Sequence, residues 1–283
     1  MILLASALPL RAVVNAGNPG GNTKVPTGKN GEPSDPGFAN VSGNGMSSAI
    51  YLGDGWVLTA KHTRAIGFRY ARTNYKWDGV NNFVIPGADL RLFRLTEPLK
   101  LGPVRIVEKA PPVGSDVVMI GRGRASEKQI SFWQVDNTQN PWAWTQVSDP
   151  SMANAAGILA PGKPVRSWGT NRIQQYSGDP QTSPMFVTDF SDNPAERTPF
   201  EAQAVHNDSG GGVFVKDEEG WALTGIMVSV GKLYPNQPGI QSKPIFIGSA
   251  FFGNLTVCVN LAPHREYIHK VMNGEIAPPE PKQ

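Results

Sequence analysis

The sequence predicts an all-β protein with many short strands and one α-helix near its C-terminus. Glycine (31) and proline (25) are frequent and follow no fixed period along the 283 residues, which excludes collagen-like and low-complexity classes. Short apolar runs lie between these turn residues, a pattern typical of sandwiches and barrels. Only the segment after Pro263 changes to helical spacing, with Ile268, Val271 and Met272 on one face and Gly274 as a stop.

The composition excludes several functional classes. Hydrophobic residues make up 40% and charged residues 17% of the chain, which favours an ordered globular protein over a disordered one. The net charge of +3 is spread thinly, without the dense Lys/Arg cluster that nucleic-acid binding needs. No apolar run reaches the length of a transmembrane helix. We therefore expect neither a nucleic-acid partner nor a membrane span.

Cysteine and histidine usage give no sign of a metal or cofactor. Cys258 is the single cysteine of the sequence, so an intrachain disulfide is impossible. We expect it to be a small buried residue in a strand over residues 255–261; a nucleophile or metal ligand is the alternative reading. His206, His264 and His269 lack metal-ligand spacing with acidic or cysteine partners, so no metal and no cofactor are predicted.

The strands are predicted from short apolar runs between turns. Two of them flank Gly53-Asp54-Gly55, and Asp-Gly between two such runs is a hairpin signal. Residues 125–200, which hold four tryptophans, are harder to assign; we expect these tryptophans to fill a local core. The predicted strands are residues 48–51, 56–60, 67–70, 82–85, 89–95, 104–107, 116–120, 130–135, 165–168, 213–215, 221–230 and 256–261.

The N-terminus shows features of a secretory signal. Residues 1–12 form the predicted signal segment: residues 1–10 are apolar and Arg11-Ala12 follows, like the apolar region and cleavage site of an exported protein, although a basic start is missing. A first strand of the folded protein is the alternative. Residues 13–44 are rich in Gly, Asn, Pro and Lys and are predicted to form an N-terminal arm or loop.

Three segments carry residues suited to acyl transfer. His62 ends an apolar strand, Asp89 opens another, and Ser209 lies in the glycine-rich turn Asn207-Asp208-Ser209-Gly210-Gly211. Each alone is more often structural than functional. Together they supply a nucleophile, a base that takes its proton, and a carboxylate that orients the base. Glycines beside the serine let backbone N–H groups turn toward a developing oxyanion.

These segments resemble the trypsin/chymotrypsin family of serine proteases, in a bacterial-type, disulfide-free form. Residues 58–62 (LTAKH) are similar to Leu-Thr-Ala-Ala-His, residues 208–211 match Asp-Ser-Gly-Gly, and residues 89–95 are similar to Asp-Ile-Ala-Leu-Leu-Arg-Leu. Residues 114–123 resemble the strand ending in Gly-Trp-Gly, and residues 221–229 the strand that lines the cleft. The order His, Asp, Ser along the chain is that of chymotrypsin.

The resemblance implies two six-stranded antiparallel β-barrels, with the site between them. The first barrel would span residues 45–108, and the second residues 109–261, including a Trp-rich insertion. A C-terminal helix and tail would occupy residues 262–283. The family matches about residues 45–125 and 200–272, and residues 125–200 match it poorly.

The resemblance also implies roles for single residues. His62 would act as general base and then acid, Asp89 would orient it, and Ser209 would be the nucleophile. The backbone N–H groups of Asn207 and Ser209 would form the oxyanion hole, and Ser229 would contact the substrate backbone. Asn207 stands where the family has glycine, at a position with an unusual backbone conformation that Asn tolerates better than most residues.

Two further expectations concern the pocket and the N-terminus. The residue six before the nucleophile is Gln203, which predicts a neutral specificity pocket. One extra residue near Met227 leaves the alignment of the cleft around Ser229 open by one position.

In the family the residue matching Asp208 often pairs with a new terminal amine. Cleavage before Val13 would supply one here; pairing of Asp208 with local backbone is the alternative.

The sequence thus predicts a serine endopeptidase that hydrolyses peptide bonds through an acyl-enzyme. We expect a secreted or periplasmic bacterial protein, monomeric, with a peptide or protein as its partner. Two alternatives stay open: an inactive homologue that acts as a binding protein, and an esterase that uses the same three residues.

Overall fold

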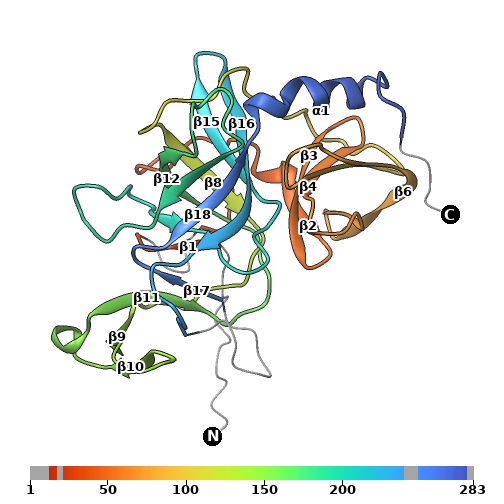
Figure 1. The fold of residues 1–283 in the computed structure, drawn as a ribbon. Helices are drawn as coiled ribbons and strands as arrows, with labels where there is room; N and C mark the ends of the chain where they lie inside the picture. The colour runs from red at the N-terminus through yellow and green to blue at the C-terminus, as the bar shows by residue number, and fades with distance from the viewer. Residues whose placement is uncertain (1–12, 18–21, 239–247, 279–283) are drawn as a thin grey trace, which may run out of the picture.

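The computed structural model describes residues 13–17, 22–238 and 248–278, and it contains two six-stranded antiparallel barrels side by side (Figure 1). The first barrel has the strand order β2-β3-β4-β7-β6-β5, and its end strands β2 and β5 lie against each other. Its strands are β2 (Val41–Asn44), β3 (Ser47–Gly53), β4 (Trp56–Ala60), β5 (Gly67–Tyr70), β6 (Thr73–Val84) and β7 (Leu90–Leu95).

The second barrel is closed in the order β12-β13-β18-β16-β15-β8. The pairing of β16 with β18 shifts register between Met227 and Ser229, where the sequence showed one extra residue. The single cysteine, Cys258, is buried in β18. The strands are β8 (Asp116–Gly121), β12 (Ser167–Tyr176), β13 (Met185–Asp189), β15 (Gly212–Asp217), β16 (Gly220–Gly231) and β18 (Leu255–Asn260). The predicted all-β class with two six-stranded barrels is therefore confirmed.

The Trp-rich insertion forms a third sheet beside the second barrel. Its strands are ordered β10-β9-β11-β17, at the lower left of Figure 1. Trp133, Trp144 and Phe251 pack edge to face, with ring centroids 5.1–6.3 Å apart, and form the local core that was expected of the tryptophans. The four strands are β9 (Ser131–Asp136), β10 (Ala143–Val147), β11 (Ala155–Ala160) and β17 (Gly248–Phe251), and the 3-10 turn η2 (Pro150–Met152) links β10 to β11.

The N-terminal arm is more ordered than predicted. Val13 and Val14 are buried, and β1 (Val14–Asn15) pairs with β14 (Ala202–Gln203). After the 3-10 turn η1 (Phe38–Asn40), β2 begins at Val41, so the first barrel starts before residue 45. The predicted signal segment, residues 1–12, lies outside the described residues.

One hydrophobic core joins the two barrels. Ile50 and Leu58 from the first barrel share a cluster with Ile120, Phe214 and Ile226 from the second. Because all five side chains are fully buried, apolar packing holds the barrels together and fixes the surface between them.

The predicted C-terminal helix is present as α1 (Arg265–Met272), lying across the top of Figure 1. Ile268 and Val271 enter the core shared by the barrels. Pro263 lies in the preceding 3-10 turn η3 (Ala262–His264), and Gly274 adopts a left-handed φ of 77° just past the helix. Within the described residues, the search for membrane-spanning helices finds no candidate.

Three strand predictions differ clearly from the structure. The predicted residues 165–168 overlap only the start of β12, which continues to Tyr176. Residues 104–107 form only a single bridge, between Ile106 and Leu223, because the segment runs between the barrels instead of joining a sheet. β6 is far longer than the predicted residues 82–85, since it pairs first with β5 and then, after a register shift, with β7. The sequence analysis missed its first half, although Tyr75 and Trp77 alternate with polar residues there.

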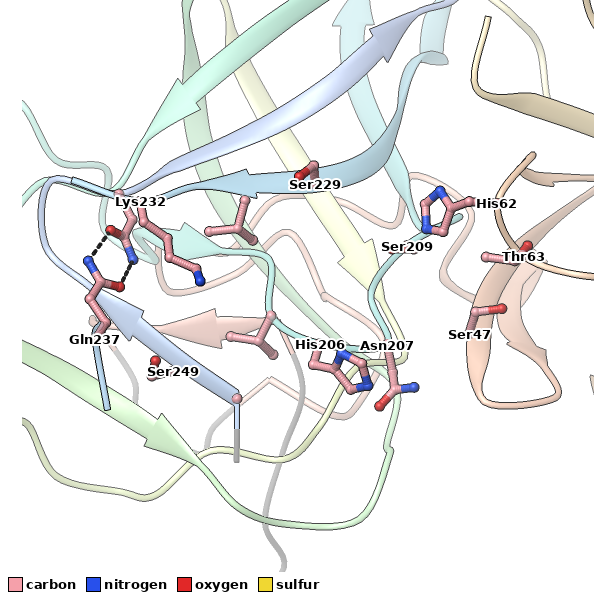
Figure 2. A pocket seen from close by; sticks show the side chains of 14 residues that line it. Ser47, His62, Thr63, His206, Asn207, Ser209, Ser229, Lys232, Gln237 and Ser249 are labelled. Atoms are coloured by element: carbon pink, nitrogen blue, oxygen red, sulfur yellow. Dashed lines mark hydrogen bonds between the residues drawn. The ribbon is translucent and has the colours of Figure 1, made fainter. Parts of the chain in front are cut away.

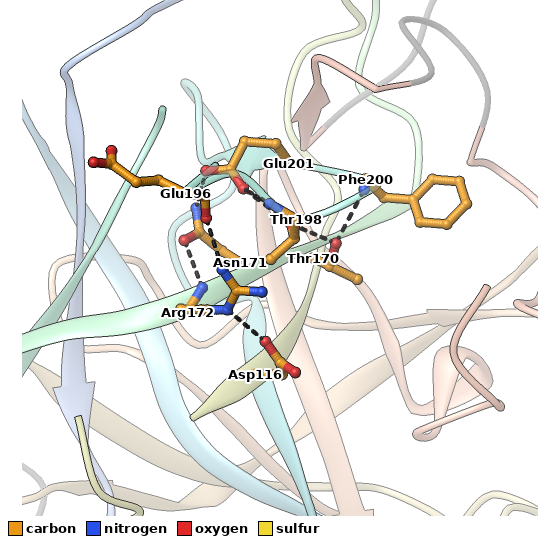
Figure 3. A network of polar contacts seen from close by, with 8 residues as sticks. All are labelled: Asp116, Thr170, Asn171, Arg172, Glu196, Thr198, Phe200 and Glu201. Carbon is orange, nitrogen blue, oxygen red and sulfur yellow. Dashed lines mark hydrogen bonds and ion pairs between the residues drawn. The ribbon is translucent and has the colours of Figure 1, made fainter. Parts of the chain in front are cut away.

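A buried carboxylate organises the loop that leads into β14 (Figure 3). Glu201 accepts hydrogen bonds from the backbone N–H and hydroxyl of Thr198, from the Ser191 N–H, and from the Asn171 amide. Burial raises the pKa of Glu201, against the opposing effect of these hydrogen bonds. The loop before the Ser209 turn is thereby held at a defined place on β12.

Candidate active site

His62 and Asp89 meet because they lie at adjoining ends of two paired strands. β4 pairs with β7 up to Ala60 opposite Leu90, so the residues just beyond this pair are neighbours. His62 Nδ1 lies 2.7 Å from Asp89 Oδ2, and the His62 backbone N–H donates to Oδ1 at 3.0 Å. An Nδ1–H held by a carboxylate leaves Nε2 free to accept a proton.

The turn that carries Ser209 is held by the first barrel. The Ser209 carbonyl accepts the Ser48 N–H at 2.9 Å, and the Gly210 N–H donates to the Met227 carbonyl at 2.8 Å. Gly210 has a φ of 89°, and a Cβ there would collide with the Ser48 carbonyl and the Thr59 hydroxyl. Glycine is therefore required at this position both by its conformation and by the close approach of β3 and β4.

The peptide before Ser209 is oriented by a serine from the other barrel. Asn207 has a φ of 78°, which lies in the left-handed region. The sequence analysis expected an unusual backbone conformation at this position. The carbonyl of Asn207 accepts a hydrogen bond of 3.1 Å from the Ser48 hydroxyl. The oxygen of that hydroxyl in turn accepts a hydrogen bond of 2.7 Å from the Arg122 N–H. Within the described part of the chain, the N–H groups of Asn207 and Ser209 have no hydrogen-bond acceptor, so both are available to an incoming oxyanion.

These groups open onto a cavity of about 420 Å³ (Figure 2). His62, Asn207 and Ser209 form one side of it. The opposite walls come from the end of β16, the segment after it, and β17. The remaining lining residues are Ser47, Thr63, Val205, His206, Ser229, Val230, Lys232, Gln237, Gly248, Ser249 and Asn254.

The structure separates the two predicted substrate-binding residues. Ser229 is exposed and lines the cavity. Gln203 is fully buried in β14 and does not line it. The lining contains a lysine, Lys232, so the described pocket differs from the neutral one that Gln203 predicted.

Asp208 lies behind the cavity and is fully buried. Its carboxylate accepts the Val205 N–H at 2.9 Å and the Gly123 N–H at 2.6 Å, and the backbone N–H of Val13 also donates to it. Burial nevertheless raises the pKa of Asp208 to about 7. A Cβ on Gly121 or Gly123 would collide with this carboxylate, which explains both glycines around Arg122.

The polar lining residues that the sequence analysis did not assign to the site are Ser47, Thr63, His206, Lys232, Gln237, Ser249 and Asn254. The position of Lys232, three residues after Ser229, was the one signal that could have indicated it. Ser249 and Asn254 carry no local signal, because β17 was not predicted and its pairing with β11 is what brings it to the cavity.

Comparison with known proteins adds a likeness of fold. No family model and no curated protein matches the sequence. Among solved structures, kallikrein-related peptidase 10 is similar over 84% of this chain and 96% of its own, at 17% identity and a TM-score of 0.47. Neuropsin, a serine protease of mouse brain, is similar over 80% of this chain and 89% of its own, at 16% identity and a TM-score of 0.45. At this identity the likeness concerns the fold alone, and the function is argued from the site.

Proposed function

We propose that the chain is a serine endopeptidase that cleaves peptide bonds through an acyl-enzyme. The observation that carries the proposal is the imidazole of His62, held by Asp89 at 2.7 Å, facing the same cavity as Ser209. An oriented base beside a serine in a glycine-rich turn is the arrangement that activates a hydroxyl for attack on a carbonyl carbon.

The proposed reaction has two halves. Ser209 Oγ bonds to the scissile carbonyl carbon while His62 Nε2 takes its proton, and the oxyanion accepts the N–H groups of Asn207 and Ser209. The carbon–nitrogen bond then breaks, and His62 gives its proton to the leaving amine. Water repeats the sequence on the acyl-enzyme, which releases an acid and restores Ser209.

A substrate would lie extended along the free end of β16. Ser229 is exposed there and faces the cavity, and main-chain pairing along an edge strand is a general way to hold a peptide. We propose that the protein acts as a monomer on peptides or proteins outside the cytoplasm. An exported location fits the apolar, signal-like residues 1–12.

The proposal includes a processing step at the N-terminus. The backbone N–H of Val13 donates to the buried carboxylate of Asp208. Cleavage between Ala12 and Val13 would turn this N–H into an ammonium group at the same place. An ion pair between this ammonium and Asp208 would then replace the hydrogen bond. Burial alone disfavours the ionised form of Asp208, and the ammonium would stabilise that form.

Labelling with a fluorophosphonate probe tests the proposal. We expect the folded, processed protein to be labelled and Ser209→Ala to remain unlabelled, because only an activated serine reacts at a useful rate. Ser151→Ala, which removes an exposed serine on η2, is the control and should be labelled like the wild type. Absence of labelling in folded, processed protein would favour the binding-protein alternative, and cleavage of small esters without any peptide cleavage would favour the esterase.

A further inference from the structure

We infer that the cavity beside Ser209 selects an acidic side chain on the acyl side of the scissile bond, with Lys232 as its counter-ion. The inference rests on the proposed function and names its substrate class. Nothing in the sequence motifs pointed to it, since Gln203 predicted a neutral pocket.

Lys232 follows β16 directly and is three residues beyond Ser229. Figure 2 shows its side chain extending into the space between the end of β16 and Ser249 of β17, on the far side of the cavity from His62. None of the ion pairs found among the described residues involves Lys232. Its ammonium group is therefore available to a ligand.

The lining offers no competing carboxylate. No aspartate or glutamate occurs among the described residues that line the cavity. Arg124 adds positive charge nearby: together with burial, it lowers the pKa of the lining residue His206. The local potential thus favours an anion.

A second polar group in the cavity also lacks a partner. Ser249 is only 7% exposed, and its hydroxyl has no hydrogen-bond partner within the described part of the protein. A buried hydroxyl without a partner is costly. A ligand carboxylate could accept from both Ser249 and Lys232, which would satisfy the hydroxyl and neutralise the ammonium.

Gln237 and Asn254 stabilise the wall of the cavity on the side of Lys232. Gln237 and Asn254 exchange two amide hydrogen bonds of 2.8 and 3.0 Å, and the Leu233 N–H donates to the Asn254 side chain at 3.0 Å. Because their amides are used on each other, these two residues hold the segment that carries Lys232. They leave recognition of the ligand to Lys232 and Ser249.

Other side chains fit this lining less well. A lysine or arginine would face a like charge without a carboxylate to receive it. An apolar side chain would cover the ammonium and the Ser249 hydroxyl without bonding to either. Glutamine matches glutamate in shape but forms weaker, uncharged hydrogen bonds, so the comparison of these two isolates the contribution of charge.

The test uses four fluorogenic peptides that differ only in the residue on the acyl side of the scissile bond: Glu, Gln, Leu or Lys. For the wild type we expect kcat/KM to be about 10- to 100-fold higher for Glu than for Gln, the range for a hydrogen bond to a charged group. In Lys232→Met the two values should become nearly equal, and Lys232→Glu should favour the Lys peptide. Lys216→Met, on an exposed position of β15, is the matched control and should keep the wild-type ratio.

Fluorophosphonate labelling of each variant separates the two proposals. Labelling with equal cleavage of the Glu and Gln peptides, or a Glu preference that survives Lys232→Met, would overturn the inference while leaving the protease function intact. No labelling and no cleavage of any of the four peptides would overturn the function, and the inference with it.

Discussion

Asp208 shows how one residue can couple the N-terminus to the site. It is adjacent to Ser209, fully buried, and contacted by the backbone of Val13. A carboxyl whose pKa is raised by burial is more stable in its neutral form. A new amine at Val13 would reverse this preference and stabilise the anion, together with the turn that holds Asn207 and Ser209.

We expect the pH dependence of stability to report this pairing. With residues 1–12 attached, burial raises the pKa of Asp208 to about 7, well above the ordinary value of an aspartate. The neutral carboxyl of Asp208 therefore stabilises the folded protein fully below about pH 4. This stabilisation, on the order of 4 kcal/mol, is lost as the pH rises through about 7. A chain that begins at Val13 should lose much less over this range, because the ammonium favours the ionised carboxyl.

Thermal unfolding of the two chains between about pH 4 and pH 7 is the measurement, with Ser209→Ala in both to prevent self-cleavage. Asp208→Asn in the longer chain is the control, since it removes the ionisation and should flatten the same part of the profile. Buried Glu201 and half-buried Asp189 also have raised pKa values, but they are common to all three proteins. Identical profiles for the longer and shorter chains would contradict the pairing.

At the residue scale, the segments with local motifs place His62 and Ser209 at one cavity, with Asp89 bonded to His62, whereas the position found by counting is buried away from it. His62, Asp89 and Ser209 were singled out because each belongs to a short segment with its own chemistry and turn residues. The placement of Gln203 at the pocket base came from counting six residues back from Ser209. In the structure β14 pairs with β1 and buries Gln203, so this count does not lead to the cavity.

At the scale of elements, the β9–β10 hairpin packs on the segment that lines the cavity. Trp144 of β10 packs edge to face on Tyr234, at 5.8 Å between ring centroids, and its indole N–H donates to the Pro235 carbonyl at 3.3 Å. Tyr234 and Pro235 lie between Lys232 and Gln237 in the sequence. The Trp-rich insertion therefore acts as a brace for the segment that lines the cavity.

Removing this brace should impair substrate recognition more than the reactivity of Ser209. We expect Trp144→Ala to lower kcat/KM for the preferred peptide by about 2- to 10-fold, since an aromatic pair of this kind contributes about 0.5–1.5 kcal/mol. The rate of fluorophosphonate labelling should stay near the wild-type value. Gln146→Ala, exposed on the same strand, is the control. A parallel loss of labelling would indicate instead that the hairpin supports the Ser209 turn.

Elements with clear turn chemistry were predicted closely. The hairpin of β3 and β4 turns at Asp54 and Gly55, which have left-handed φ values of 48° and 86°, as the Asp-Gly pair indicated. β10, β11, β13 and β17 were not predicted. All four are short. β11, β13 and β17 depend on pairing with segments far away in the sequence, which no local pattern records, whereas β10 pairs with its neighbour β9 in a hairpin.

At the scale of the whole molecule, the two barrels share one hydrophobic core. The core that joins them includes Ile50 and Leu58 on one side and Ile120 and Phe214 on the other. Ile268 of α1 reaches the same core from outside both barrels. Because the site lies at their interface, its geometry depends on the packing of the barrels as much as on either barrel alone.

We expect Ile268→Ala to lower the free energy of unfolding by about 2–5 kcal/mol, the range for removing a buried isoleucine. Unfolding should remain a single transition, because Ile268 contributes to a core that both barrels share. His269→Ala, exposed on the same helix, should change stability by less than about 0.5 kcal/mol. Scanning calorimetry measures both quantities, and two separate transitions would contradict a shared core.

The sequence by itself determined the all-β class, the hairpin turns, the C-terminal helix and the three segments that carry His62, Asp89 and Ser209. These features depend on spacing and turn chemistry over a few neighbouring residues, so a short stretch of sequence is enough to predict them. Only the tertiary structure decided which residues wall the cavity. Lys232, Ser249 and the paired amides reach it because β16, β17 and the insertion pack together. That packing is set by pairing and burial between distant segments, and so no single stretch of sequence shows it.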